Sequence, residues 1–225
     1  MIKAIILDYG GTLANSNVSL DAVFERAVER LLIEGLEVSA LDFKNAFMDT
    51  VEWRSTIQEE GKEVDVHGFF SHVLGIFGRE VSRDVTDELG LIIYEAGDPE
   101  WLGDIEKLLI ELSGQYKIAL LSNAWLEAPR QILRDMGYSR WFDAMVVSFD
   151  IGIPKPDPRI FQHTLNLLGV EAHEAVMVGD SIKADIEGAL NAGLEAIWVD
   201  NKGTGEWTGN TISNLDELPE LLRKL

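Results

Sequence analysis

The chain has 225 residues, of which 46% are hydrophobic, contains no cysteine and carries a formal net charge of −20. The lack of cysteine excludes disulfides, thiolate catalysis and cysteine-ligated metals, and the negative charge argues against nucleic acids and anionic membranes as partners. The length suits one large domain or a core with a smaller insert. Without a leader pattern or a long apolar segment, a cytoplasmic protein is expected.

Five short apolar runs predict strands, at Ile2–Leu7, Lys117–Leu121, Ala144–Ser148, Ala175–Val178 and Glu195–Val199. Helical patterns accompany the later runs, at Trp101–Leu112, Glu127–Met136, Pro158–Leu168 and Ile182–Ala192. Strands that alternate with helices at this spacing are typical of a parallel sheet covered on both faces. The sequence therefore predicts an α/β fold with a Rossmann-like core.

The interval between the first two runs has a different pattern. Four amphipathic stretches predict helices, from Ser19 to Gly35, from Ser39 through Trp53, over Val66–Phe77 and over Ser82–Glu95. No strand is expected from residue 16 to about residue 97. These helices could flank the sheet, but an interval of this length is too long for one crossover. We therefore predict a four-helix domain at residues 16–96, inserted into a core of residues 1–15 and 97–225.

Polar side chains follow the predicted strands, at the edge where ligands bind in open α/β sheets. These residues are Asp8, Ser122, Asn123, Lys155, Asp180 and Asp185. A lysine and a hydroxyl group can hold an anion beside a divalent ion bound to carboxylates, which suits phosphoryl transfer. Oxygen ligands of this kind favour Mg²⁺.

Four segments resemble the four motifs of the haloacid dehalogenase (HAD) superfamily. In chain order they are Asp8-Tyr-Gly-Gly-Thr-Leu, Leu-Leu-Ser122-Asn123, Lys155-Pro-Asp-Pro-Arg-Ile-Phe and Gly179-Asp180-Ser-Ile-Lys-Ala-Asp185-Ile-Glu-Gly-Ala. Their order and spacing agree with the family over the whole chain, and the helical insert lies where the family has its C1-type cap. The resemblance implies a hydrolase of the phosphatase branch, a phosphoric monoester hydrolase.

The resemblance also implies catalytic and metal-binding roles. Asp8 is expected to attack phosphorus and form an aspartyl-phosphate. Mg²⁺ is expected to bind the carboxylates of Asp8 and Asp180 and the backbone carbonyl group of Gly10, which a glycine retains. Lys155 is expected to take part in catalysis by screening Asp8 from the approaching anion.

Further residues of the motifs are expected to bind or orient. Ser122, Asn123 and Lys155 are expected to bind the transferring group, Asn123 also orienting its loop. Asp185 is expected to orient a metal-bound water without touching the metal. The Thr12 hydroxyl is expected to bond to the backbone of its turn.

Gly10 departs from the family pattern, Asp-x-Asp-x-Thr, which has a second aspartate there. In family phosphatases this aspartate protonates the leaving alcohol and later deprotonates the attacking water. A positioned acid/base typically contributes ~10²–10⁴ in rate. Three interpretations stay open: a phosphatase with a substitute acid/base, such as water or a cap residue; another hydrolase, such as a haloacid dehalogenase or phosphonatase; and a non-catalytic metabolite-binding or regulatory protein.

Two observations favour the phosphatase. Dehalogenases of the family need no metal, yet the acidic Gly179-Asp180-Ser181 segment is present. Phosphonatases need a cap lysine with a lowered pKa, and the insert offers only Lys44 and Lys62, neither in a recognisably apolar setting. A small phosphorylated metabolite is the expected substrate, enclosed when the cap closes. The sequence identifies neither the metabolite nor the oligomeric state.

Candidates for recognising that metabolite are Trp53, Arg54, His67, Phe69, Phe70 and Trp125. In the simpler interpretation, which we favour, the aromatic residues form the core of the helical domain and Arg54 is an exposed cation.

Overall fold

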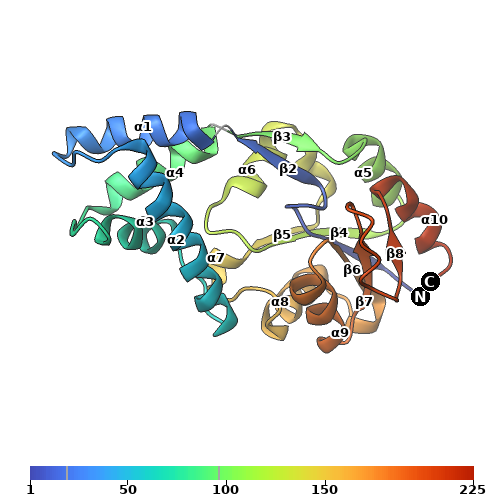
Figure 1. Ribbon diagram of the computed structural model, residues 1–225. Helices are drawn as coiled ribbons and strands as arrows, with labels where there is room; N and C mark the ends of the chain where they lie inside the picture. The colour runs from blue at the N-terminus through green and yellow to red at the C-terminus, as the bar shows by residue number, and fades with distance from the viewer. Residues whose placement is uncertain (19, 96) are drawn as a thin grey trace. The chain divides into compact units, whose positions relative to one another are not determined.

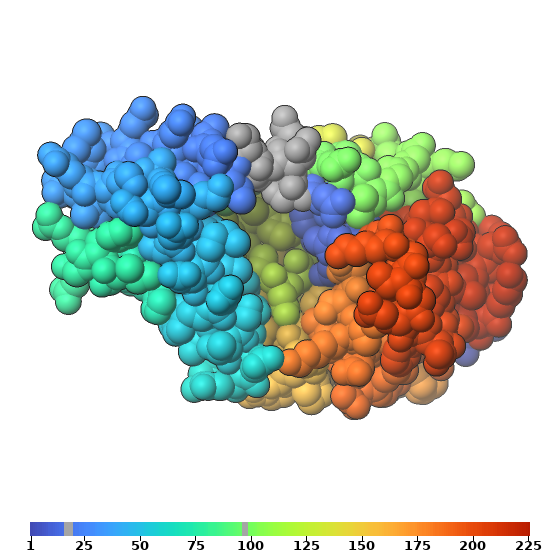
Figure 2. Space-filling model, viewed as in Figure 1, coloured from blue at the N-terminus to red at the C-terminus, as the bar shows by residue number. Residues whose placement is uncertain are grey.

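The computed structural model describes residues 1–18, 20–95 and 97–225. The chain divides into two compact units, one of Met1–Asn15 with Pro99–Leu225 and the other of Ser16–Asp98. We refer to them as the α/β unit and the helical unit. In Figures 1 and 2 the helical unit is coloured from blue to green, and the α/β unit takes the first blue segment and the colours from green to red. Within the described part of the chain, no helix has the length and apolarity needed to cross a membrane.

The α/β unit is built on a six-stranded sheet in the order β5-β4-β1-β6-β7-β8, in which all neighbouring strands are parallel. The strands are β1 (Ala4–Leu7), β4 (Lys117–Ser122), β5 (Ala144–Val147), β6 (Ala175–Gly179), β7 (Glu195–Val199) and β8 (Thr211–Ile212). The predicted α/β fold with a Rossmann-like sheet is confirmed.

Helices follow most of these strands. They are α5 (Ile105–Ser113), α6 (Ala128–Asp135), α7 (Ser148–Ile151), α8 (Pro158–Leu168), α9 (Gly188–Asn191) and α10 (Leu218–Leu222), with 3₁₀ turns η1 (Tyr138–Trp141), η2 (Ala172–Glu174) and η4 (Leu215–Glu217) and a π-helical segment η3 (Ile182–Glu187). Because side chains alternate along a strand, Ile5 and Leu7 pack with Leu109 of α5 on one face, and Ile6 packs with Phe161 of α8 on the other.

The centre of the sheet is the place where the strand order reverses. Strand β1 lies between β4 and β6, with Leu7 opposite Leu120 on one side and Val178 on the other. Chain connections leave such a point in opposite directions, which opens a crevice at the carboxyl ends of the strands. Asp8 is the first residue beyond β1, and its backbone N–H donates to Val178 O at 3.0 Å. The fold therefore places Asp8 in the crevice.

The helical unit consists, in its described part, of α1 (Leu20–Ile33), α2 (Ala40–Glu59), α3 (Val66–Gly75) and α4 (Arg83–Glu95). The four predicted helices are thus present. Ser39 caps α2 by accepting a hydrogen bond from Asp42 N at 3.1 Å, as predicted, and Asp65 caps α3 through Gly68 N at 2.8 Å. The proposed cap at Ser19 lies outside the described residues.

Aromatic rings fill the core of the helical unit. Phe69 and Phe70 are fully buried, and Phe47 meets Phe69 edge-on with 5.0 Å between ring centroids. Trp53 stacks on His72 at 4.0 Å. These contacts agree with the interpretation of the aromatic residues as core.

The expectation of an exposed Arg54 is wrong. Its side chain is only 14% exposed, and its Nε donates to Oε1 of the fully buried Glu63 carboxylate at 2.8 Å. The buried carboxylate draws the guanidinium inward because an unpaired buried charge is costly. His67 Nδ1 lies 3.0 Å from Thr86 Oγ1, and Trp125 is half-buried in the α/β unit.

The expectation of no strand from residue 16 to about residue 97 is wrong at its start, where a strand extends to Val18, and a second strand begins where the interval ends, at Gly97. Strands β2 (Ala14–Val18) and β3 (Gly97–Trp101) pair in a separate two-stranded sheet. Their sequences, Ala-Asn-Ser-Asn-Val and Gly-Asp-Pro-Glu-Trp, are rich in residues that are rare in strands. The two segments pair where the chain enters and leaves the helical unit. The periodicity of hydrophobic residues in the sequence does not predict this pairing.

Three predicted boundaries also change. Helix α5 begins at Ile105 instead of Trp101, because Asp104 caps it by accepting from Lys107 N at 3.1 Å. Ser148 opens α7 instead of ending β5. The helix expected from Ile182 begins as the π-helical η3 before α9.

Candidate active site

Lys155 lies at the centre of the polar groups at the carboxyl edge of the sheet. Its ammonium group is buried and contacts three oxygens: Asp8 Oδ1 at 2.7 Å, Asp185 Oδ1 at 2.5 Å and the backbone carbonyl of Leu121 at 2.8 Å. Three donors thus meet three acceptors. One side chain thereby joins the loop between α7 and α8, the residue after β1, and η3.

Asn123 fixes the loop that carries Lys155. Its amide nitrogen donates to Lys155 O at 2.8 Å, and its amide oxygen accepts from Lys155 N at 2.7 Å. Ser148, which the sequence did not single out, supports the same region by accepting from Ala124 N at 3.0 Å. Ser122 is buried at the end of β4, directly after Leu121, so its hydroxyl belongs to the same edge.

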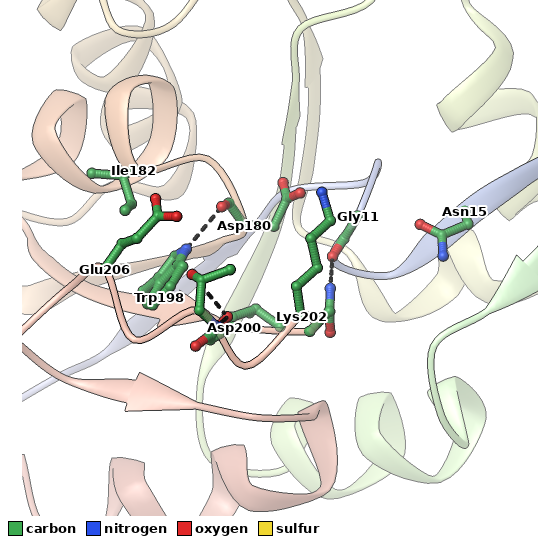
Figure 3. Close-up of a pocket in the computed structure, with 11 residues that line it drawn as sticks. Gly11, Asn15, Asp180, Ile182, Trp198, Asp200, Lys202 and Glu206 are labelled. Atoms are coloured by element: carbon green, nitrogen blue, oxygen red, sulfur yellow. Dashed lines mark hydrogen bonds between the residues drawn. The ribbon is translucent and has the colours of Figure 1, made fainter.

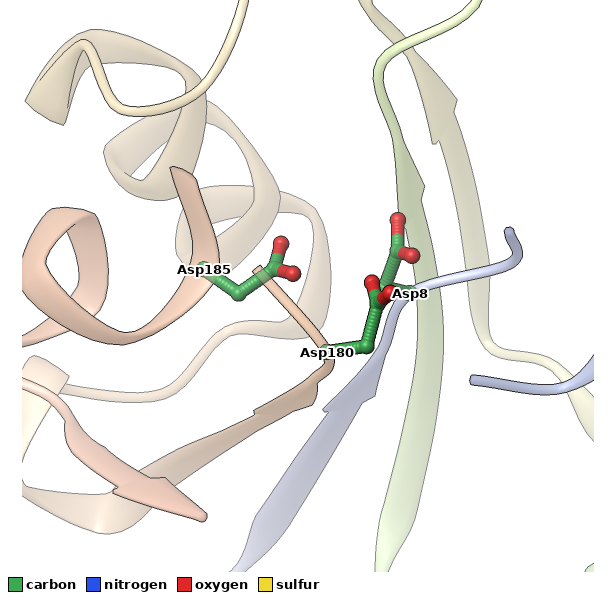
Figure 4. Close-up of side chains that lie close together, drawn as sticks. All are labelled: Asp8, Asp180 and Asp185. Atoms are coloured by element: carbon green, nitrogen blue, oxygen red, sulfur yellow. The ribbon is translucent and has the colours of Figure 1, made fainter. Parts of the chain in front are cut away.

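Three carboxylates gather around this lysine. Asp8, Asp180 and Asp185 each offer an oxygen, and these oxygens lie within 4.8 Å of one another; Figure 4 shows the three side chains converging from two strand ends and from η3. Both Asp185 oxygens accept hydrogen bonds, from Lys155 Nζ and from Ser181 N. Asp8 Oδ2, in contrast, has no hydrogen-bond partner among the described residues.

The cluster holds more negative than positive charge. Burial raises the pKa of Asp8 to about 7; Lys155 opposes the rise, and the charges of Asp185 and Asp180 add to it. Burial, followed by the charge of Asp185, also raises the pKa of Asp180. Burial alone lowers the pKa of Lys155, but Asp185 and Asp8 outweigh it and hold that pKa above its ordinary value. Three carboxylates against one ammonium leave room for a further cation.

Two glycines give the carboxylates their space. A Cβ at Gly11, whose φ is +71°, would lie 2.1 Å from Asp180 Oδ2, and a Cβ at Gly179 would lie 2.3 Å from Asp185 Cγ. At such separations a side chain at either position would have to displace the neighbouring carboxylate. Close approach of backbone to carboxylate is thus built into two of the motifs.

We expect Gly11→Ala to lower the affinity for Mg²⁺ at least about tenfold, because the new methyl group displaces the Asp180 carboxylate. Isothermal titration with Mg²⁺ measures this loss. Gly35→Ala is the matched control, since Gly35 has a φ of +75° but nothing within 4 Å of its Cβ position. It shares the backbone strain of about 1–3 kcal/mol without the collision. Equal Mg²⁺ affinity in the two variants would contradict the account.

Gly10 and Thr12 complete the turn after β1. Gly10 is exposed, its φ lies outside the left-handed region, and a Cβ there would meet nothing within 4 Å. Thr12 is fully buried, and the hydrogen bond expected for its hydroxyl is absent: Oγ1 has no partner among the described residues, whereas its backbone N donates to Tyr9 O at 3.3 Å. The turn closes through backbone bonds, so the hydroxyl is not needed for it.

A pocket of about 460 Å³ lies beside the turn, within the α/β unit. Its lining residues are Gly11, Asn15, Asp180, Ile182, Trp198, Val199, Asp200, Asn201, Lys202, Thr204 and Glu206 (Figure 3). Sequence reasoning missed the contribution of the loop after β7. Its only signal was a polar, glycine-rich composition, which does not show where a loop lies.

Mg²⁺ fits the donor set. Its preferred ligands are oxygens, and the cluster offers three carboxylates. Burial raises the pKa values of Asp8 and Asp180, and the charges of the neighbouring carboxylates add to the rise. Asp8 and Asp180 are suited to hold Mg²⁺, whereas Asp185 already uses both oxygens.

The metal-free protein is expected to lose stability as the pH rises from 3.8 to about 7. Within that range folded Asp8 keeps a proton that unfolded Asp8, with its pKa of 3.8, has lost, so a rising pH favours unfolding. Mg²⁺ binds the ionised carboxylates and should therefore raise Tm more at about pH 8 than at about pH 5. At about 100 times its Kd, it adds about 2.7 kcal/mol to the free energy of unfolding. Thermal unfolding in EDTA and in Mg²⁺ tests this; equal shifts at both pH values would argue against it.

The chain belongs to the haloacid dehalogenase-like hydrolase family, whose model matches residues 2–193. The resemblance described above is thereby confirmed. Over 128 residues the chain is 36% identical to N-acylneuraminate-9-phosphatase of Rattus norvegicus, a match that covers 54% of this chain and 52% of that protein. The chain thus spans about half the length of this relative.

Two further comparisons extend over nearly whole chains. Glyceraldehyde 3-phosphate phosphatase of Methanothermobacter thermautotrophicus is 27% identical over 231 aligned positions, 98% of each chain. A crystal structure of 2-haloacid dehalogenase from Pseudomonas syringae pv. Tomato DC3000 superposes with a TM-score of 0.75 at 23% identity, covering 100% of this chain and 99% of that one. At that identity the superposition shows the fold alone.

Proposed function

We propose that this protein is a Mg²⁺-dependent phosphatase that hydrolyses a small phosphorylated metabolite through an aspartyl-phosphate on Asp8. The observation that carries the proposal is the environment of the Asp8 carboxylate. One oxygen is held by the buried Lys155 ammonium at 2.7 Å, and the other has no partner among the described residues. A carboxylate fixed in this way can present an oxygen to phosphorus.

Each residue of the cluster has a definite task in this mechanism. Asp8 forms the bond to phosphorus, and Lys155 favours the ionised form of Asp8 and reduces its repulsion of the anion. Asp185 holds the far side of the Lys155 ammonium at 2.5 Å, and Asn123 fixes the loop. Mg²⁺, held by Asp8, Asp180 and the Gly10 carbonyl, would neutralise charge on the phosphoryl oxygens.

Ser122 is assigned to the transferring phosphoryl group because it is buried beside Leu121, whose carbonyl oxygen already contacts Lys155 Nζ. All three Lys155 donors are occupied, so Lys155 can bind the phosphoryl group only by exchanging one contact. We place its main effect on Asp8.

Two of the relatives described above are phosphatases, which favours this function over dehalogenation. The acidic cluster points the same way, since Asp180 adds negative charge where a halide would leave as an anion. A binding protein without turnover is the remaining alternative, and Gly10 is the observation in its favour.

The test is hydrolysis of a panel of small phosphate esters with Mg²⁺ and with EDTA. Turnover that needs Mg²⁺ is expected, falling by at least about 10² on metal removal, since the metal supplies several kcal/mol of charge stabilisation. A protein that binds these esters but releases no phosphate would be a binding protein instead.

A further inference from the structure

The turn after Asp8 has no acid for the leaving group. Gly10 has no side chain, and its Cβ position opens into space. Expelling an alkoxide without a proton donor is slow, so an ester of an ordinary alcohol needs an acid from elsewhere. The pocket beside the same turn contains a side chain that can supply one.

Among the described residues that line this pocket, Lys202 is the only cation. Figure 3 shows its side chain extending from the loop after β7 along Gly11 toward Asp180. The charge of Lys202 also opposes the rise in the pKa of Asp180, as a nearby ammonium would. Lys202 therefore reaches the edge of the carboxylate cluster.

The loop is held in this position by its neighbours. Asn201 donates to the backbone oxygen of Gly11, which ties the residue before Lys202 to the turn after Asp8. Asp200 accepts from Thr204 N at 3.0 Å and from Gly205 N at 2.9 Å, which closes the loop on itself. On β7, the Trp198 ring donates to Asp180 O at 2.8 Å. The chain before Lys202 is thus anchored to the site, and the chain after it is bonded back to Asp200.

The ammonium itself is uncommitted. In the described part of the chain, the Lys202 ammonium makes no hydrogen bond or ion pair, although three carboxylates, Asp180, Asp200 and Glu206, line the same pocket. Lys155, by contrast, has all its donors occupied. The Lys202 ammonium is therefore free to donate a hydrogen bond to a ligand.

We propose that Lys202 is the acid that protonates the leaving alcohol, in place of the side chain that Gly10 lacks. This rests on the proposed phosphatase function. As the bond from Asp8 to phosphorus forms and the ester bond breaks, the ester oxygen keeps the electron pair and takes a proton from the Lys202 ammonium. In the second step water attacks phosphorus, gives its proton to the neutral amine and releases Asp8. Both groups are restored.

The test is a series of phosphate esters whose leaving groups range from nitrophenol to a simple alkyl alcohol. Lys202→Met should lower kcat/KM for alkyl esters about 10²-fold and change it less than about threefold for the nitrophenyl ester, which leaves without a proton. Gly10→Asp combined with Lys202→Met should restore alkyl turnover. Lys224→Met, which removes an exposed ion pair with Glu220, is the matched control and should match wild type throughout.

An equal loss for every leaving group would mean that Lys202 only binds or screens the substrate and would overturn the proposal, as would no loss at all. Lys202→Gln, a second neutral variant, and the Mg²⁺ affinity of each variant separate this loss from misfolding or a weakened metal site. If wild-type protein hydrolyses no ester in the series, the proposed function itself fails. If it hydrolyses them with Lys202 dispensable, only the present inference fails.

Discussion

Asp8→Asn is expected to reduce phosphate ester hydrolysis by at least about 10⁴, to the background of the preparation. The amide cannot form an acyl phosphate as a carboxylate does, and it places a neutral group against the Lys155 ammonium at 2.7 Å. Initial rates with a nitrophenyl ester, at Mg²⁺ concentrations that saturate wild type, measure the effect.

The control must show that the site survives in this variant. Removing one partner of a buried pair is costly, so Asp8→Asn is also expected to change stability. Asp185→Asn is matched to it, because it likewise removes a carboxylate contact with Lys155, here at 2.5 Å, without removing the nucleophile. If both variants lose activity equally, the effect comes from displacing Lys155 and not from losing the attacking group.

Gly10→Asp is expected to increase turnover of alkyl phosphates, by up to about 10²–10⁴ when Lys202 is replaced by Met and by less when Lys202 already supplies the proton. The backbone at residue 10 is compatible with a side chain, and its Cβ position meets nothing within 4 Å. A carboxyl group there can protonate the leaving alcohol and then deprotonate the attacking water. Steady-state kcat/KM for an alkyl ester measures the gain.

Gly10→Asn is the control for Gly10→Asp, because it adds a side chain of the same shape that is neither an acid nor a base. We expect it to leave the wild-type rate unchanged or lower it. An equal increase in both variants would show that a side chain at residue 10 helps only by filling space.

The fold was predictable from the sequence because its signals are local. Runs such as Ala4–Leu7 and Glu195–Val199 are short, apolar and rich in β-branched residues, and helix starts such as Ser39 carry their own caps. Strands β2 and β3 were missed because their residues carry no such signal. The pairing of β2 with β3 depends on how the whole helical unit between them folds.

The candidate site likewise has features that the sequence predicts and features that it does not. The order of the motifs predicted that Asp8, Lys155, Asp180 and Asp185 lie at one edge of the sheet. No rule of sequence spacing predicts that Lys155 bridges Asp8 and Asp185. The location of Lys202 beside the site could not be predicted from the sequence, because it depends on the hydrogen bond between the loop after β7 and Gly11. The prediction that Arg54 is exposed was wrong for a related reason. Its partner, Glu63, is buried by packing, which the sequence does not reveal.

The central claim is that Asp8 carries the phosphoryl group during turnover. A rapid-quench experiment with a nitrophenyl ester and Mg²⁺ tests it, followed by mass analysis of the peptide that contains Asp8. Because nitrophenolate leaves without a proton, formation of the aspartyl-phosphate is fast. Lys202 then keeps its proton and Gly10 has no side chain, so no base is ready to deprotonate the water that hydrolyses the aspartyl-phosphate. We predict a burst of nitrophenol close to one per protein chain and a phosphoryl group on Asp8. Turnover with no burst and no label on Asp8, under conditions that preserve acyl phosphates, would contradict the account.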